Sequence, residues 1–197
     1  MRLTPLLWWL AVAVAVLLAL SGFHQGYPIT HSVAMNLSWT AQFSQQVLAG
    51  QWWPHWLEQA FASMGNPTFN FYPPISLYAT VPFVALGAST STALIGSMTL
   101  ASIMLAIGAY KYSASVFQAS NLPYLPALVA SLTVLSPYFL EDVYIRGSLG
   151  EVWAIVWLPW LLWALQFNLN TGRAWFWVSL FYALLALSHL PTVLIVT

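Results

Sequence analysis

Long stretches without any charged side chain dominate this sequence. No Asp, Glu, Lys or Arg occurs in residues 59–110, 112–140 or 174–197. Charged residues make up 4% of the chain and apolar residues 60%, so a globule of this composition would lack the polar surface that keeps a protein soluble. The sequence therefore predicts an all-α, polytopic transmembrane protein with the lipid bilayer as its solvent.

Five apolar stretches are candidates for membrane-spanning helices, each of which needs roughly 20 mainly apolar residues. We expect spans at about residues 3–22, 92–110, 123–140, 150–167 and 174–188. The first stretch is followed by no small-residue cleavage site, which favours an uncleaved helix over a signal peptide. The apolar run at the C-terminus is too short to cross a membrane. We therefore expect a single membrane domain, 1–197, that is a truncated part of a longer polypeptide.

Residues 74–88 are shorter than a span and are interrupted by proline and glycine. Their composition favours a re-entrant or interfacial helix, with a crossing helix as the alternative. If this segment does not cross, Arg2, Lys111 and Arg173 lie on one face of the membrane and the carboxylates lie on the other. Positive residues favour the cytoplasmic side. We therefore expect a cytoplasmic N-terminus and a long exported loop at residues 23–91.

The predicted exported loop contains an uncharged amphipathic segment. From Val33 to Leu48 a helical wheel separates apolar side chains, Phe43 and Leu48 among them, from polar ones such as Gln42. This pattern predicts a helix that lies along the membrane interface.

Four of the eight charged residues fall within residues 141–151, which makes this segment the main candidate for chemistry. Arg146 is expected to pair with Glu141 or Asp142. Its planar fork of donors suits a phosphate group, and ionisable groups at a membrane boundary commonly mark functional sites. A solvated loop between two helices is the alternative interpretation.

The helix that follows this segment begins with a capping-box pattern, Ser148-Leu149-Gly150-Glu151. In such a box the Ser and Glu side chains satisfy backbone donors of the first turn. A capped helix start also points N–H groups and a positive dipole end at an approaching anion. Glu151 is therefore a candidate both for capping and for a role in the site.

Histidines in the predicted loop, together with Glu58, are candidates for acid–base chemistry. His24, His31 and His55 have spacings that match no metal motif, so neither a metal nor a cofactor is predicted. If their segment is helical, His55 and Glu58 share a helix face, as a general base and its orienting partner would. A surface pair is the alternative.

Aromatic residues mark two further places. Residues 69–74, Phe-Asn-Phe-Tyr-Pro-Pro, form a stiff rim with the phenol of Tyr72, which suits a substrate mouth; an aromatic belt is the alternative. His189 is expected to be a packing histidine. Four tryptophans recur at helical spacing in the fourth span, where lipid or helix contact is expected: Trp153, Trp157, Trp160 and Trp163.

Several function classes lack support in the sequence. Without cysteine there is no disulfide or thiolate nucleophile, and a net charge of zero gives no nucleic-acid-binding surface. Nucleotide-binding loops, His-Glu-x-x-His and Gly-x-Ser-x-Gly motifs do not occur.

Three motifs in order resemble those of a known family: Gly50-Gln51-Trp52-Trp53-Pro54-His55-Trp56, Gly65-Asn66-Pro67-Thr68-Phe69-Asn70-Phe71-Tyr72-Pro73-Pro74 and Tyr144-Ile145-Arg146-Gly147-Ser148-Leu149-Gly150-Glu151. Together they resemble the bacterial membrane-protein family labelled 6-pyruvoyl-tetrahydropterin-synthase-related. That family is similar to the GT-C membrane glycosyltransferases. The resemblance covers nearly the whole chain.

The resemblance implies a many-spanning protein of the bacterial plasma (inner) membrane that uses a polyprenyl-phosphate-linked sugar on the exported side. The implied catalytic candidates are His31, Glu58 and Asp142. The implied substrate-binding residues are Arg146, Glu151, Tyr72 and His55. GT-C enzymes carry an acidic residue soon after the first span, whereas this chain has His31-Ser32 there and no acid between Arg2 and Glu58. That departure favours the alternative, a non-catalytic lipid or polymer transporter or an assembly component.

Overall fold

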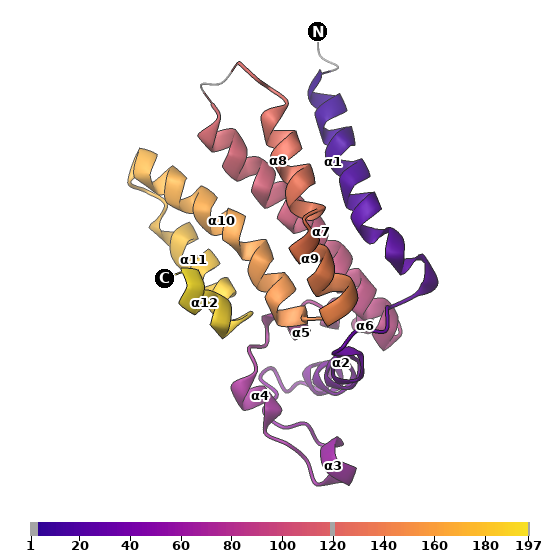
Figure 1. The fold of residues 1–197 in the computed structure, drawn as a ribbon. Coiled ribbons are helices and arrows are strands. Elements are labelled where there is room, and N and C mark those ends of the chain that lie inside the picture. Colours follow the sequence, from indigo (N-terminus) through magenta and orange to yellow (C-terminus); the bar gives the residue numbers. More distant parts are fainter. Residues whose placement is uncertain (1–3, 119–120, 197) are drawn as a thin grey trace.

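A computed structural model describes residues 4–118 and 121–196 of the chain. Within these residues the regular structure is helical, apart from one antiparallel bridge between Leu57 and Asn66. The long helices at residues 4–20 and 90–171 form a bundle, and the helices between residues 33 and 85 gather at one end of it (Figure 1). The predicted all-α class is confirmed.

The bundle and the segment at its end are built from successive stretches of the chain. The bundle consists of α1 (Thr4–Leu20), which continues into a 3-10 turn (Ser21–Gln25), and of α7 (Thr90–Val116), α8 (Leu125–Val134), α9 (Pro137–Glu141), α10 (Leu149–Thr171), α11 (Trp175–Ala186) and α12 (Leu190–Val196). We call residues 26–89 the loop region, and it contains α2 (Val33–Leu48), α3 (Ala60–Ser63), α4 (Thr68–Phe71), α5 (Ile75–Tyr78) and α6 (Val81–Ala85).

Among the described residues, four helical segments are long and apolar enough to cross a membrane: Leu6–Gln25, Thr90–Val116, Leu125–Arg146 and Leu149–Thr171. They overlap the first four predicted spans. The fifth predicted span corresponds to α11, which has only 12 residues. The helix ends there because Pro191 has no N–H to extend it, and the Leu187 carbonyl instead accepts the N–H of Ile75 at 3.0 Å.

The segment predicted to be re-entrant or interfacial forms two short helices, α5 and α6, with Pro82 in the first turn of α6. Both lie beside α2 at the same end of the bundle (Figure 1). The turn between η2 (Asp142–Arg146) and α10 lies at this end too, whereas the C-terminal ends of α7 and α10 lie at the opposite end. The charged segment therefore faces the loop region.

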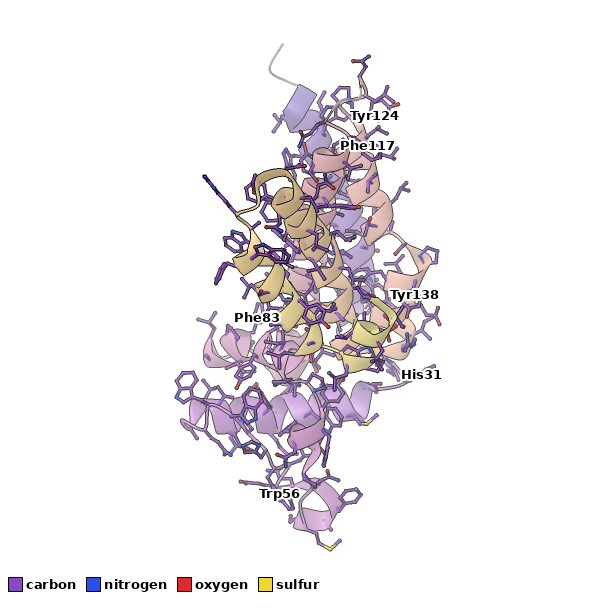
Figure 2. All side chains as sticks on the ribbon, turned by 90° about the vertical axis from the view of Figure 1, so that its left-hand side faces the viewer. His31, Trp56, Phe83, Phe117, Tyr124 and Tyr138 are labelled. Carbon is purple, nitrogen blue, oxygen red and sulfur yellow. The ribbon has the colours of Figure 1, made fainter. Side chains whose placement is uncertain are left out.

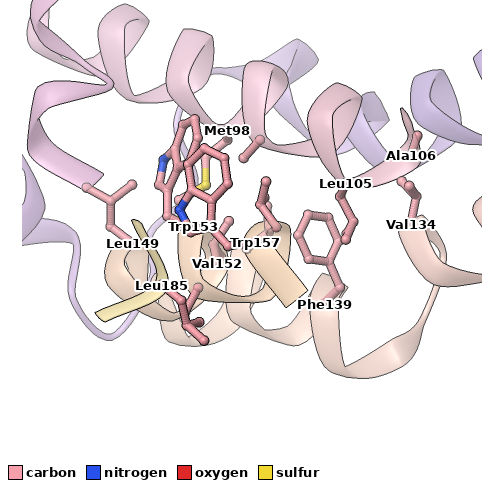
Figure 3. Packing of buried hydrophobic residues seen from close by; sticks show 14 of the residues in the cluster. Met98, Leu105, Ala106, Val134, Phe139, Leu149, Val152, Trp153, Trp157 and Leu185 are labelled. Carbon is pink, nitrogen blue, oxygen red and sulfur yellow. The ribbon is translucent and has the colours of Figure 1, made fainter. Parts of the chain in front are cut away.

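The core of the bundle forms where α7 and α10 pack against each other (Figure 3). Small residues of α7 let the tryptophans of α10 approach closely, and a Cβ atom at Gly108 would collide with the Trp160 ring. The indole N–H of Trp153 donates to Ser97 Oγ at 3.0 Å, and that of Trp160 donates to the Met104 carbonyl at 2.9 Å. These tryptophans therefore make the helix contacts that their spacing predicted.

Helix α2 has the predicted bounds, but its buried face is more polar than the helical wheel indicated. Phe43 and Val47 are buried, and so are Asn36 and Gln42, whereas Leu48 is 52% exposed. The reason is that other segments of the chain satisfy these polar groups, because Asn36 donates to the Gly147 carbonyl and Gln42 accepts the backbone N–H of Gln59.

Candidate functional site

The charged segment follows a break in the third apolar helical stretch. Pro137 begins α9 after an extended residue, and the chain then forms a π turn from Asp142 to Arg146. Such turns occur frequently at functional sites. Gly147 ends the turn with a φ of +65°, and a Cβ atom there would collide with the Thr30 side chain. This position therefore needs glycine for both its backbone angle and its close contact with the loop region.

Arg146 lies between two carboxylates. Its Nη1 is 2.5 Å from Asp142 Oδ1, and its Nη2 is 2.7 Å from Glu151 Oε2. We call these three residues the carboxylate–arginine site. The Asp142 side chain is fully buried, whereas the Arg146 side chain is 40% exposed. The predicted pairing with Asp142 is confirmed, but the second partner is Glu151 and not Glu141, whose side chain is exposed.

Tyr138 completes a closed ring of hydrogen bonds with this ion pair. Its hydroxyl group donates to Glu151 Oε1 and accepts a hydrogen bond from the Arg146 guanidinium. Ser148 Oγ donates to Glu151 Oε2 at 3.3 Å. Ser148 precedes α10 as predicted, but its hydroxyl does not cap a backbone N–H, so the reciprocal capping box does not form. Glu151 instead uses both oxygens inside the site.

Asp142 has an oxygen that is not used. Its Oδ2 is buried and has no hydrogen-bond partner in the part of the chain that the structure describes. With two carboxylates and one guanidinium, the site carries one negative charge in excess when all three groups are ionised. An unpartnered carboxylate oxygen in a buried position is costly. Asp142 is therefore suited to accept a proton or a donor from a ligand.

The loop region closes over the π turn through three hydrogen bonds. The backbone N–H of His31 donates to the Ile145 carbonyl at 2.9 Å, and the N–H of Ser32 donates to the Arg146 carbonyl at 3.2 Å. Asn36 Nδ2 donates to the Gly147 carbonyl at 2.7 Å. The carbonyls of Ile145 and Arg146 end a helical stretch, and that of Gly147 also accepts the N–H of Leu149 at 3.0 Å. Exposed His31 therefore lies at the edge of the site, on the same side of the molecule as Tyr138 (Figure 2).

Tyr72 reaches the start of α10 from the loop region. Its hydroxyl group is hydrogen-bonded to the backbone of Gly150. Burial raises the pKa of Tyr72, and the charge of Glu151 raises it further, so the phenol stays protonated. The other two aromatic residues of the predicted rim lie in different environments: Phe69 is buried in the core, whereas Phe71 is 78% exposed.

His189 also lies within the electric field of the site. Its Nδ1 is 2.8 Å from Thr192 Oγ1. Burial lowers the pKa of His189 and nearby Arg146 lowers it further, while Glu151 has the opposite effect. The sequence indicated only a packing role for this histidine. Like Tyr138 and Asn36, it reaches the site through the fold, and no spacing in the sequence connects it with Arg146.

The structure does not bring His55 and Glu58 to this site. Their segment lies near Trp56, at the end of the loop region away from Tyr138 (Figure 2). The chain there is not helical, and Leu57 forms the bridge with Asn66, so the two side chains do not share a helix face as predicted. Glu58 lines a separate cavity. Among the described residues, no group of three or more potential metal ligands is found.

Comparisons of the chain with protein-family models, curated proteins and solved structures found no match. What the site can do therefore rests on its own geometry. The Arg146 guanidinium has five N–H donors. Its bonds to Asp142, Glu151 and Tyr138 leave some of these donors unused. With 40% of the side chain exposed, these donors are open to an anionic ligand, and two carboxylates lie close by.

Proposed function

We propose that this chain carries the site of a GT-C-like glycosyltransferase that uses a polyprenyl-phosphate-linked sugar. The observation that supports it best is the partly exposed Arg146 guanidinium, held by Asp142 and Glu151 at the end of an apolar helix bundle. A lipid-linked phosphate enters from the side of the bundle, so its charged group arrives at this boundary. A planar guanidinium with unused donors suits phosphate oxygens.

The transfer forms a bond between an acceptor oxygen and the anomeric carbon of the sugar, and it breaks the bond from that carbon to the phosphate oxygen. Arg146 stabilises the negative charge that develops on the departing polyprenyl phosphate. Asp142 takes the proton of the acceptor hydroxyl, because its Oδ2 has no hydrogen-bond partner among the described residues. Glu151 and Tyr138 hold the guanidinium in position. His31, at the edge of the site, is the alternative base.

This proposal is tested with the full protein in proteoliposomes supplied with polyprenyl-phosphate-glucose and a panel of acceptor lipids and glycans. Arg146→Ala and Asp142→Asn should abolish formation of a new glycoside, while Arg146→Lys should leave a small fraction of it. Arg173→Ala is the matched control, because Arg173 is exposed at the opposite end of α10. Undiminished transfer by Arg146→Ala would overturn the proposal.

One observation favours a second function, a non-catalytic lipid or polymer transporter or an assembly component. Arg146 is already neutralised by its two carboxylates, as in a structural ion-pair network. The same proteoliposomes separate the two functions, because a transporter delivers the lipid-linked sugar unaltered and a transferase yields a new glycoside.

The proposed orientation in a bacterial inner membrane has the N-terminus in the cytoplasm and the loop region exported. The native chain has no cysteine, so single cysteines report on one position each. Glu141 is the last residue of α9, at the end of the bundle that carries the loop region, and Gln118 follows α7 at the opposite end. Both native side chains are exposed, so Glu141→Cys and Gln118→Cys are suitable reporters. Gly147 is unsuitable because of its positive φ. An impermeant reagent added to intact cells should label position 141 and spare position 118; the reverse result would place the site in the cytoplasm.

A further inference from the structure

A second polar cavity lies in the loop region, separate from the carboxylate–arginine site. It has a volume of about 190 Å³ and forms between the C-terminal half of α2 and the segment after Gly50. Its lining is unusual in this apolar protein, because it consists largely of primary amides with one carboxylate: Gln42, Gln45, Gln46, Gln51, Gln59 and Glu58. We call it the glutamine cavity.

Hydrogen bonds hold the walls of the glutamine cavity in place. Buried Gln42 accepts the backbone N–H of Gln59 at 2.9 Å through Oε1 and donates to Ser38 Oγ at 3.0 Å. Gln46 Nε2 donates to the Trp56 carbonyl at 2.7 Å. These bonds attach the segment around Trp56 to α2. The cavity therefore has fixed walls, and a ligand does not need to organise them.

Other polar groups of the cavity are unused. In the described part of the chain, the side chains of Gln45, Gln51, Gln59 and Glu58 make no hydrogen bond or ion pair. Each amide offers two N–H donors and an acceptor oxygen, and the carboxylate is an acceptor only. The lining contains no Lys or Arg. An anion would therefore meet the Glu58 charge with no compensating cation, and a bare cation would leave the amide donors unmatched.

A ligand with several hydroxyl groups matches this lining, because each hydroxyl both donates and accepts. The volume is below the roughly 300–1,000 Å³ of drug-sized pockets, so it suits one small ring. We infer that the glutamine cavity binds one ring of a neutral saccharide, either as a free sugar or as the end unit of a longer chain.

This binding is separate from the proposed transfer reaction. It uses no residue of the carboxylate–arginine site, and it is expected in a transferase and in a non-catalytic protein alike. A failure of one of the two proposals is thus distinguishable from a failure of the other.

Saturation-transfer NMR on the full protein in nanodiscs tests the inference. The probes are glucose, galactose, N-acetylglucosamine and maltotriose, with glucuronate as the anionic counterpart. At least one neutral sugar should receive saturation, and glucuronate should receive none. Binding to maltotriose alone would identify the end unit of a longer chain as the ligand, and binding to a monosaccharide would identify a free sugar.

Variants at exposed lining positions locate the signal. Gln45→Leu combined with Gln51→Leu should weaken sugar binding about tenfold or more, because at least one ligand hydrogen bond is lost. Gln118→Leu, an exposed glutamine outside the cavity, should bind normally. Glu58→Gln should keep the neutral sugar and admit glucuronate. The inference is wrong if no neutral sugar receives saturation, or if the double variant, shown to be folded by circular dichroism, binds as well as the native protein.

Discussion

At the end of the bundle, Arg146 is fixed by ion pairs with carboxylates. In the loop region, the neutral amides of Asn36, Gln42 and Gln46 are fixed by hydrogen bonds to backbone groups. Arg146 lies within 2.7 Å of two carboxylate oxygens, beside a fully buried Asp142. Glu58, the one carboxylate of the loop region, is exposed and forms no ion pair with any residue that the structure describes. The difference follows from solvation: an isolated charge is costly beside an apolar bundle and is tolerated where water reaches it. Removing a charge should therefore destabilise the protein far more at the end of the bundle than in the loop region.

The largest effect is expected for Arg146→Ala, which leaves Asp142 buried without its cation. Breaking one partner of a buried ion pair typically costs roughly 3–5 kcal/mol. Glu58→Ala is the matched change in the loop region and should alter the free energy of unfolding by less than about 0.5 kcal/mol. Thermal unfolding in detergent, followed by circular dichroism, checks both. Equal midpoints for the two variants would show that the solvation contrast is wrong.

Gly147→Ala should have the next largest effect. The alanine would have to adopt a left-handed φ and would also displace Thr30 of the loop region. Such strain costs about 1–3 kcal/mol. Gly172 also has a positive φ, of +67°, but a Cβ there meets no atom within 4 Å. Gly172→Ala should therefore destabilise less, and the difference between the two unfolding midpoints measures the contact with Thr30 alone.

Asn36→Ala should loosen the loop region with a smaller effect on the bundle. The change removes the hydrogen bond to the Gly147 carbonyl, which still accepts the N–H of Leu149, and a lost hydrogen bond of this kind costs about 0.5–1.5 kcal/mol. Limited proteolysis of the loop region should become faster. Asn70→Ala is the control, because Asn70 is exposed and its side chain has no hydrogen bond among the described residues. If both variants resist protease as well as the native protein does, Asn36 does not hold the loop region in place.

The smallest effect is expected from pH. The pKa of His189 is lowered in the folded protein, chiefly by burial, so the unfolded chain binds a proton more readily. Stability should therefore be highest above the ordinary histidine pKa of about 6.5 and should fall as the pH drops through the lower, folded value. His189→Gln should flatten this part of the stability profile. An unchanged profile would show that His189 does not contribute to it.

The sequence predicted the elements better than it predicted their contacts. The bounds of α2 followed from apolar spacing, and the charged segment was identified because so little charge occurs elsewhere. The buried face of α2 was predicted incorrectly, because spacing along one helix does not show which distant segments of the chain pack against it and bond to its polar side chains. Gln42 is buried for this reason, and Leu48 is exposed.

The partners of Arg146 show the same limit. Asp142 lies four residues before Arg146 and was a natural partner from spacing. Glu151 became the second partner because Gly147 turns the chain back at the end of a π turn, which a 3.6-residue period does not indicate. Tyr138 comes from the preceding helix and Asn36 from the loop region. These residues reach the site only once the helices have packed.

The central claim, that Arg146 binds a lipid-linked phosphate, is tested most directly by native mass spectrometry of the full protein with polyprenyl phosphate and with the corresponding polyprenol. The native protein and Arg173→Ala should retain polyprenyl phosphate in preference to polyprenol, and Arg146→Ala should lose that preference. Equal retention of the two lipids by the native protein, or an unchanged preference in Arg146→Ala, would contradict the claim.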